Sequence, residues 1–312
     1  MDLLHEDRPE NLVDWDSNKF KEFMDSFDHV FSDCDGVLWL AEPLPQVGLF
    51  FEAMERLGKT VHFVSNCSIR SKENYESKFQ QAGIENGYEK LIIPSRAIAD
   101  FLVEHNFHKA AYCVTCPETI KVLEAVGIRC KSGPDLASDF HEDYEVFSEE
   151  DPDIGAVIFD SDLRGNLAKL HKAINYLRNP DVLFICGSTD RLIHFRKGGT
   201  PAIGCSIFTD IVAVETCRIP IILSKPSKEF GEYAMRRAGI TRPNRVLFIG
   251  DMIEQDIAIG KATGFKTLML LTNTSFDAMM AHGTKPDYYI ESLASIVPKF
   301  YDVIPSVLNG VH

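Results

Sequence analysis

The sequence predicts an α/β protein in which a Rossmann-like domain with a parallel sheet is interrupted by a smaller inserted domain of α+β type. Short apolar segments typical of buried strands alternate with helix-like segments along most of the 312 residues. This alternation restarts near residue 110, and its first pattern resumes after residue 209. Polar residues follow several of the predicted strands, which is where open α/β sheets bind ligands.

The predicted first domain comprises residues 1–96 and 209–312, and the predicted insert comprises residues 97–208. Before the insert, a strand that ends near Asp33 is followed by a predicted helix at 47–57, a strand at 60–66 and two helices at 71–81 and 92–104. Gly58 and Gly83 stand just beyond two of these helices, where glycine commonly ends a helix. This order of elements is typical of a parallel sheet covered by helices.

The insert repeats the alternation in a smaller unit. Its predicted strands and helices alternate over 110–114, 117–127, 156–159, 167–177 and 182–186. An acidic stretch, 135–153, lacks periodicity and is predicted to be an exposed loop. When the first pattern resumes, we expect strands at 219–223, 245–249, 267–271 and 287–290, with helices at 227–238 and 255–263.

Composition limits the classes of partner. The net charge is −14, so we expect no nucleic-acid partner and no binding to anionic membranes. No apolar run is long enough to span a bilayer. Eight cysteines without a secretory signal favour reduced thiols and a cytoplasmic location.

The first predicted strand ends in Asp33, Cys34, Asp35 and Gly36. Side chains alternate along a strand, so we expect Asp33 and Asp35 to lie on the same side of the chain. Two carboxylates that close repel each other, and a magnesium ion is the usual compensation. Gly36 allows a sharp turn close to a ligand. The alternative is an ordinary Asp-Gly turn at a strand end.

Three further strands also end in polar residues, at Ser65-Asn66, at Lys225 and at Asp251. Together with Asp33 and Asp35, these ends would provide three carboxylates, a fixed cation and hydrogen-bond donors. A carboxylate can attack phosphorus when a metal and a cation offset the repulsion between two anions. Taken singly, each residue is also explained by a cap, a turn or a surface position, but together they favour a phosphoryl-transfer site.

These strand ends resemble the motifs of the haloacid-dehalogenase-like hydrolases. The segment from Asp33 to Leu38 resembles D-x-D-G-x-L, and Ser65 and Lys225-Pro226 resemble the second and third motifs. Gly250-Asp251 with Asp256 resembles G-D-x-x-x-x-D. The sequence around these motifs is most similar to the 4-nitrophenylphosphatase subgroup, which includes phosphoglycolate phosphatase and pyridoxal phosphate phosphatase and carries a C2-type cap.

The resemblance implies a role for each matched residue. Asp33 would be the nucleophile, and Asp35 would protonate the leaving group and then activate water. Mg2+ would be held by Asp33, the backbone carbonyl of Asp35, and Asp251. The residues expected to bind substrate or phosphate are Gly36, Ser65, Asn66 and Lys225. Asp256 would support the metal shell or Lys225.

The expected function is therefore a magnesium-dependent phosphomonoesterase that hydrolyses a small phosphorylated metabolite of the phosphoglycolate or 4-nitrophenyl phosphate type. A pyridoxal 5'-phosphate phosphatase is the nearest alternative, and a weakly active or regulatory binding protein is an alternative of another class. A phosphoprotein substrate is disfavoured because a cap would cover the site. The family often dimerises through the cap, which makes a homodimer a candidate assembly.

The sequence departs from the family pattern around the site, and these departures leave the substrate open. They lie at Cys67, Ser224, 187–190 and 252–255. The insert also contains a basic cluster, formed by Arg191, His194, Arg196 and Lys197, in a chain that is acidic overall. This cluster could bind a second anionic group of the substrate. The alternative, a solvated surface loop, is the more common fate of charged clusters.

Overall fold

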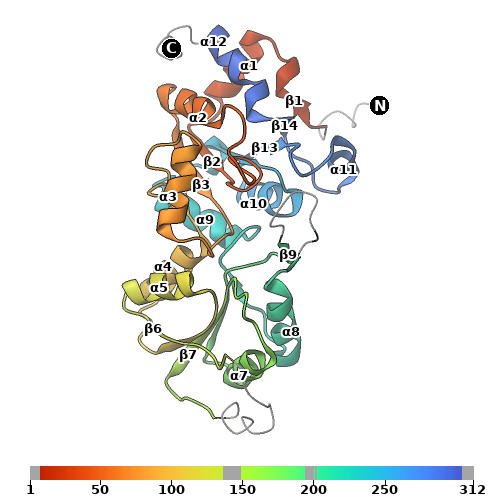
Figure 1. Ribbon diagram of the computed structural model, residues 1–312. Coiled ribbons are helices and arrows are strands. Elements are labelled where there is room, and N and C mark those ends of the chain that lie inside the picture. The colour runs from red at the N-terminus through yellow and green to blue at the C-terminus, as the bar shows by residue number, and fades with distance from the viewer. Residues whose placement is uncertain (1–7, 136–148, 194–199, 201, 304–312) are drawn as a thin grey trace. The chain divides into compact units, whose positions relative to one another are not determined.

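The computed structural model describes residues 8–135, 149–193, 200 and 202–303 (Figure 1). The chain divides into two compact units. The first comprises Met1–Ser65, Lys72–Ile92 and Lys225–His312, and the second comprises Asn66–Ser71 and Ile93–Ser224. The second unit thus begins earlier and ends later than the insert drawn from the sequence at residues 97–208.

A seven-stranded sheet forms the centre of the first unit. In spatial order its strands are β1 (Glu10–Asn11), β14 (Tyr288–Ile290), β13 (Lys266–Leu270), β12 (Val246–Gly250), β2 (His29–Ser32), β3 (Thr60–Val64) and β4 (Leu91–Ile92). All of its pairings are parallel, as the sequence predicted. β12 and β2 are neighbours, with Val246 opposite His29 and Ile249 opposite Ser32. The residues that follow these two strands therefore emerge side by side at one edge of the sheet.

The helices of the first unit begin and end at recognisable signals. They are α1 (Ser17–Asp25), α2 (Val47–Arg56), α3 (Lys72–Gln81), α9 (Lys228–Arg237), α10 (Ala258–Thr263), α11 (Phe276–Ala281) and α12 (Val297–Val303). The Ser227 side chain caps α9 by accepting a hydrogen bond from the Phe230 amide at 3.1 Å. Gly264, with a φ of 86°, ends α10 in the left-handed conformation.

One predicted helix differs in its first turn. The sequence predicts a helix over 255–263, whereas the structure has a π-helical turn at Ile253–Ile257 followed by α10. The amide of Ile257 donates to the carbonyl oxygen of Met252, five residues back, at 3.3 Å. π-helical turns are rare and frequently occur at functional sites.

Aromatic side chains fill much of the core beside β3. Phe63 on β3 contacts Phe51 of α2 and Phe79 of α3, with ring centroids 5.3 and 4.9 Å apart. Trp39, which follows β2, contacts Phe79 edge to face at 5.2 Å. All four side chains are buried. This packing anchors the segment after β2, and hence the turn that carries Asp33 and Asp35.

The second unit contains a five-stranded parallel sheet and a separate antiparallel pair. The sheet order is β11 (Ile221–Ile222), β8 (Leu183–Cys186), β7 (Ile154–Phe159), β5 (Ala110–Val114) and β6 (Arg129–Lys131). The antiparallel pair is β9 (Leu192–Ile193) with β10 (Ala202–Ile203). The expectation that the strand at 219–223 belongs to the first domain is wrong. β11 pairs with β8 of the second unit, and the Leu223 amide donates to the Cys186 carbonyl at 2.8 Å.

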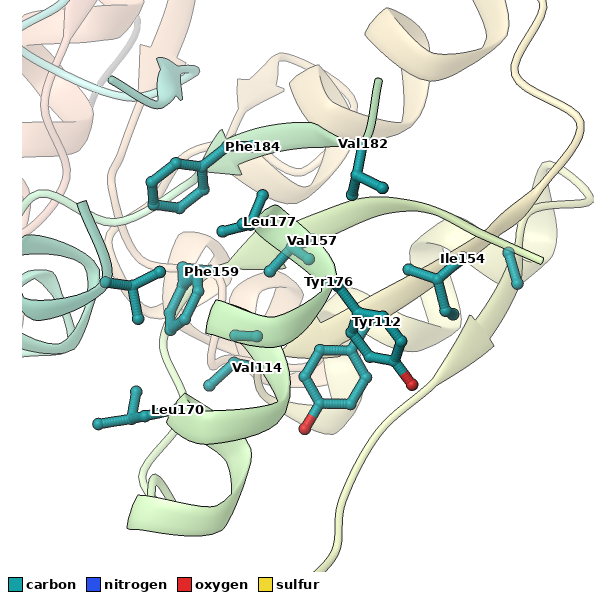
Figure 2. Close-up of a cluster of buried hydrophobic side chains, with 13 residues drawn as sticks. Tyr112, Val114, Ile154, Val157, Phe159, Leu170, Tyr176, Leu177, Val182 and Phe184 are labelled. Carbon is teal, nitrogen blue, oxygen red and sulfur yellow. The ribbon is translucent and has the colours of Figure 1, made fainter. Parts of the chain in front are cut away.

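A compact apolar core supports the second sheet. Figure 2 shows side chains of β5, β7 and β8 packed with residues of a helix, and they include Tyr112, Phe159, Leu177 and Phe184. The helices that the structure describes in this unit are α4 (Pro94–Glu104), α5 (Pro117–Ala125), α7 (Leu167–Leu177) and α8 (Ser206–Thr216). Within the part of the chain that the structure describes, no helix is long and apolar enough to cross a membrane.

Candidate active site

Three buried carboxylates meet at the carboxyl edge of the first sheet. Asp33 follows β2, Asp251 follows β12, and Asp256 lies in the π-helical turn. One carboxylate oxygen of each lies within 4.8 Å of those of the other two. The Asp33 amide donates to the Ile249 carbonyl at 2.8 Å, which ties the ends of the two strands together. The predicted pair of strand ends, Asp33 and Asp251, therefore forms one cluster.

Lys225 lies between two of these carboxylates. Its Nζ is 2.7 Å from Oδ1 of Asp33 and 2.8 Å from Oδ1 of Asp256, and the lysine is only 1% exposed. Burial alone would lower the pKa of Lys225, but the charges and hydrogen bonds of Asp256 and Asp33 raise it above its ordinary value. Lys225 is therefore a fixed cation in the cluster.

Asp256 uses both of its oxygens within the protein. Oδ1 accepts from Lys225, and Oδ2 accepts from the backbone amides of Asp251 and Met252, each at 3.0 Å. Gly250 allows this approach, because a Cβ at that position would lie 2.1 Å from the Asp256 Cβ. The geometry favours the supporting role predicted for Asp256, since its oxygens already hold Lys225 and the turn after β12.

Asp251 has one carboxylate oxygen that is available to a ligand. The residue is 0% exposed, its Oδ2 accepts a 2.5 Å hydrogen bond from Asn273 Nδ2, and its Oδ1 has no partner among the described residues. Burial and the charge of Asp256 raise the pKa of Asp251 to about 7. Burial likewise raises the pKa of Asp33, and the positive charge of Lys225 partly opposes this rise.

The donor set fits a hard divalent cation. Asp33 and Asp251 offer carboxylate oxygens, and a buried oxygen without a partner is costly unless another group compensates it. Oxygen ligands of this kind suit Mg2+. Asp33 and Asp251 could therefore hold the metal, while Asp256 and Lys225 complete the charge balance around it.

The turn after β2 brings Gly36 against Asp251. Gly36 has a φ of 90°, and a Cβ there would lie 2.1 Å from Oδ2 of Asp251. The Gly36 amide donates to the Trp39 carbonyl at 2.8 Å, and the Trp39 indole Nε1 donates to Oδ1 of Asp35 at 3.1 Å. β2 ends at Ser32, so strand alternation does not set the direction of Asp35. The Asp35 carboxylate is instead held by Trp39.

Ser65 and Asn66 fall into different units. Ser65 directly follows β3, the neighbour of β2, and its amide donates to the Ile92 carbonyl at 3.1 Å. Asn66 belongs to the second unit, where its Nδ2 donates to Oγ1 of Thr189 at 3.4 Å. Thr189 lies in segment 187–190, one of the departures from the family pattern. The predicted phosphate-binding roles of Ser65 and Asn66 stay predictions.

The structure describes only part of the basic cluster. Arg191 is exposed and forms an ion pair with Asp210, at the surface of the second unit. His194, Arg196 and Lys197 lie outside the described residues. The role of this cluster in specificity therefore stays a prediction, and Asp210 offsets part of the charge of Arg191.

Sequence reasoning missed two contacts to Asp251. Asn273 reaches Oδ2, and Oγ1 of Thr274 donates to the Asp251 backbone carbonyl at 3.0 Å. Both residues follow β13, which pairs with β12. The sequence pattern could have indicated them. Asn273 and Thr274 are polar residues that follow the predicted strand at 267–271, at the same edge of the sheet as the other strand ends.

Comparisons with known proteins agree with this arrangement. A family model described as haloacid dehalogenase-like hydrolase matches residues 30–129, and a second, described as HAD-hydrolase-like, matches residues 222–296. The chain is 31% identical to phosphoglycolate phosphatase 2 of Arabidopsis thaliana, across 90% of this chain and 96% of that protein. It is 30% identical to 4-nitrophenylphosphatase of Schizosaccharomyces pombe, across 89% and 96%.

A solved structure shares the fold. The p-nitrophenyl phosphatase from Archaeoglobus fulgidus matches with a TM-score of 0.73 and 24% sequence identity, across 88% of this chain and 99% of that chain. The predicted α/β class and the family resemblance are thereby confirmed.

Proposed function

Because this chain belongs to the haloacid dehalogenase-like hydrolase family, we propose that it is a magnesium-dependent phosphomonoesterase that forms an aspartyl-phosphate on Asp33. Its relatives are named phosphatases. The observation that carries the proposal is the cluster of Asp33, Asp251 and Asp256 around the buried Lys225, with Oδ1 of Asp251 left without a partner among the described residues. Lys225 pairs with Asp33 and Asp256 but not with Asp251, so a buried oxygen of the cluster lacks compensation among the described residues.

In the proposed first step, a carboxylate oxygen of Asp33 attacks phosphorus and the bond from phosphorus to the leaving oxygen breaks. Asp35 donates a proton to that oxygen, so the product leaves as an alcohol. The contact between Lys225 and Asp33 supports this step, because the ammonium favours the ionised, nucleophilic carboxylate and can also attract phosphoryl oxygens. A divalent cation at Asp33 and Asp251 would offset the negative charge of the substrate.

In the second step, Asp35 removes a proton from water, and the water oxygen attacks phosphorus. The bond from phosphorus to the Asp33 oxygen breaks, inorganic phosphate leaves, and the Asp33 carboxylate is restored. Trp39 supports both steps, because its indole N–H holds Oδ1 of Asp35. Gly36 supports the tight turn after β2, which packs against Asp251.

The proposed substrate is a small phosphorylated metabolite. The relatives named phosphoglycolate phosphatase and 4-nitrophenylphosphatase, which the chain matches over nearly their full length, support this class. We extend the proposal to a cytoplasmic enzyme, because all eight cysteines are free thiols. A homodimer through the second unit is the proposed assembly, and light scattering coupled to size exclusion tests it directly.

The decisive experiment is a turnover assay with 4-nitrophenyl phosphate at varied Mg2+, with Asp33→Asn as the matched inactive control. We expect turnover that requires Mg2+ and is absent in the variant. A screen that includes phosphoglycolate and pyridoxal 5'-phosphate would then identify the preferred substrate. Failure of the wild-type protein to turn over any phosphomonoester, while still binding Mg2+, would support a regulatory binding protein and refute the proposal.

A further inference from the structure

The loop that follows β13 holds Asp251 by two separate contacts. Nδ2 of Asn273 donates to Oδ2 of the Asp251 side chain at 2.5 Å. Oγ1 of the next residue, Thr274, donates to the Asp251 backbone carbonyl at 3.0 Å. Asp251 is fully buried, whereas Asn273 is exposed. A surface residue therefore restrains the side chain of a buried one.

These contacts restrain Oδ2 of Asp251 and thereby fix the direction in which Oδ1 points. Gly36 lies so close to Oδ2 that a Cβ there would be 2.1 Å away, so Oδ2 is enclosed by Gly36 and Asn273. Oδ1 has no partner among the described residues, and a carboxylate oxygen of Asp33 lies within 4.8 Å of one of Asp251. We infer that Asn273 is a positioning residue that fixes the Asp251 carboxylate so that Oδ1 is presented to the magnesium ion.

This inference rests on the metal site of the proposed function. An amide suits the task for a physical reason: its N–H donates a hydrogen bond to a carboxylate but carries no charge. A lysine at the same place would compete with the metal for Asp251, and an aspartate would add a fourth carboxylate to the site. Partners that orient a metal ligand typically change metal affinity about 10–100-fold when they are removed.

The test compares variants of two residues, Asn273 and Ser275, that lie two positions apart in the full chain. Asn273→Ala removes the donor to Asp251. Ser275→Ala is the matched control: it removes the cap of α11, whose Ser275 Oγ accepts from the Ala278 amide at 3.2 Å, and leaves Asp251 untouched. Mg2+ affinity is measured by titration calorimetry. Mn2+ serves as a second probe, because electron paramagnetic resonance reports its unbound fraction.

We expect Asn273→Ala to weaken the binding of Mg2+ and Mn2+ about 10-fold or more, and Ser275→Ala to leave both within about twofold of wild type. Equal affinities for wild type and Asn273→Ala, or equal losses in both variants, would overturn the inference, as would a wild-type protein that binds neither ion. The inference survives if Asn273→Ala alone weakens binding but wild type hydrolyses no phosphomonoester. In that case only the proposed function fails.

Discussion

Replacing Lys225 with methionine removes the only positive charge that the described structure places among the three carboxylates. The ammonium lies 2.7 Å from Asp33 and 2.8 Å from Asp256, and the residue is 1% exposed. Removing one partner from a buried ion pair costs about 3–5 kcal/mol, because it leaves an uncompensated buried charge. Here two carboxylates lose their partner together, so we expect Lys225→Met to lower the free energy of unfolding by at least that amount in chelator.

This cost converts into a measurable melting shift. With an unfolding entropy of about 2.1 cal/mol/K per residue, a chain of 312 residues shifts by about 1.5 °C per kcal/mol, so the Tm of Lys225→Met should fall by about 5–8 °C. The matched control is Lys228→Met, three residues later in α9, where Nζ is 3.1 Å from Glu232 and the lysine side chain is 60% exposed. An exposed pair of this kind contributes about 0–1 kcal/mol, so the control should melt close to wild type.

Calorimetric melting in chelator and in saturating Mg2+ completes the assay. Lys225→Met should gain more in Tm from Mg2+ than wild type does, because the cation then supplies the missing positive charge. Its turnover should be abolished in either condition. A Tm within about 2 °C of Lys228→Met in chelator would refute the reasoning, since Lys225 would then not offset the buried carboxylates.

Four further outcomes are expected, three at the candidate site and one at the pair of Asp28 and Arg245. Asp33→Asn should abolish turnover without lowering Tm, because the amide cannot act as nucleophile and one buried negative charge is removed; a lower Tm by calorimetry would count against this. Gly36→Ala should reduce turnover at least 100-fold, measured as kcat with 4-nitrophenyl phosphate, because its Cβ would lie 2.1 Å from Asp251 Oδ2. Chelator should stop turnover, Mg2+ should restore it and Ca2+ should not, since Ca2+ takes longer bonds and more ligands; equal rates with both ions would contradict this. The Arg245 hydrogen bond lowers the pKa of Asp28 from 3.8 to about 2. This pair therefore stabilises the fold above pH 3.8, and its contribution is lost as the pH falls through 2. Between pH 5 and pH 2.5, the Tm of Asp28→Asn should fall by less than the Tm of wild type, measured by calorimetry.

The residues at the centre of the site could be predicted because each one ends or follows an apolar strand segment. Asp33 and Asp251 meet for a topological reason: β2 and β12 are parallel neighbours, so their carboxyl ends lie at one edge. The position of Asp256 could not be predicted from hydrophobic periodicity alone. The spacing of Ile253 and Ile257 resembles an ordinary α-helix, but the Asp256 side chain accepts from the amides of Asp251 and Met252 and the turn widens to π-helical geometry.

The sheet to which a short strand belongs could not be predicted in the same way. The segment at 219–223 has the apolar character of a strand, and its place just before Lys225 suggested the first sheet. Hydrophobic periodicity indicates which residues of a strand are buried, but it does not indicate which neighbouring strand pairs with it. The two-residue strand β11 pairs with β8 of the second unit, and Lys225, three residues after β11, begins the last segment of the first unit.

The charges of the site connect stability to the proposed chemistry. When fully ionised, Asp33, Asp251 and Asp256 carry three negative charges and Lys225 one positive charge, which leaves two negative charges in a buried cluster. Without compensation, burial raises the pKa values of Asp33 and Asp251, so the carboxylates tend to retain protons and lose nucleophilic character. One divalent cation would supply two positive charges and offset this deficit. Under the proposed function, the deficit that makes the cluster costly to fold would also favour a divalent ion, which would keep Asp33 ionised to attack phosphorus.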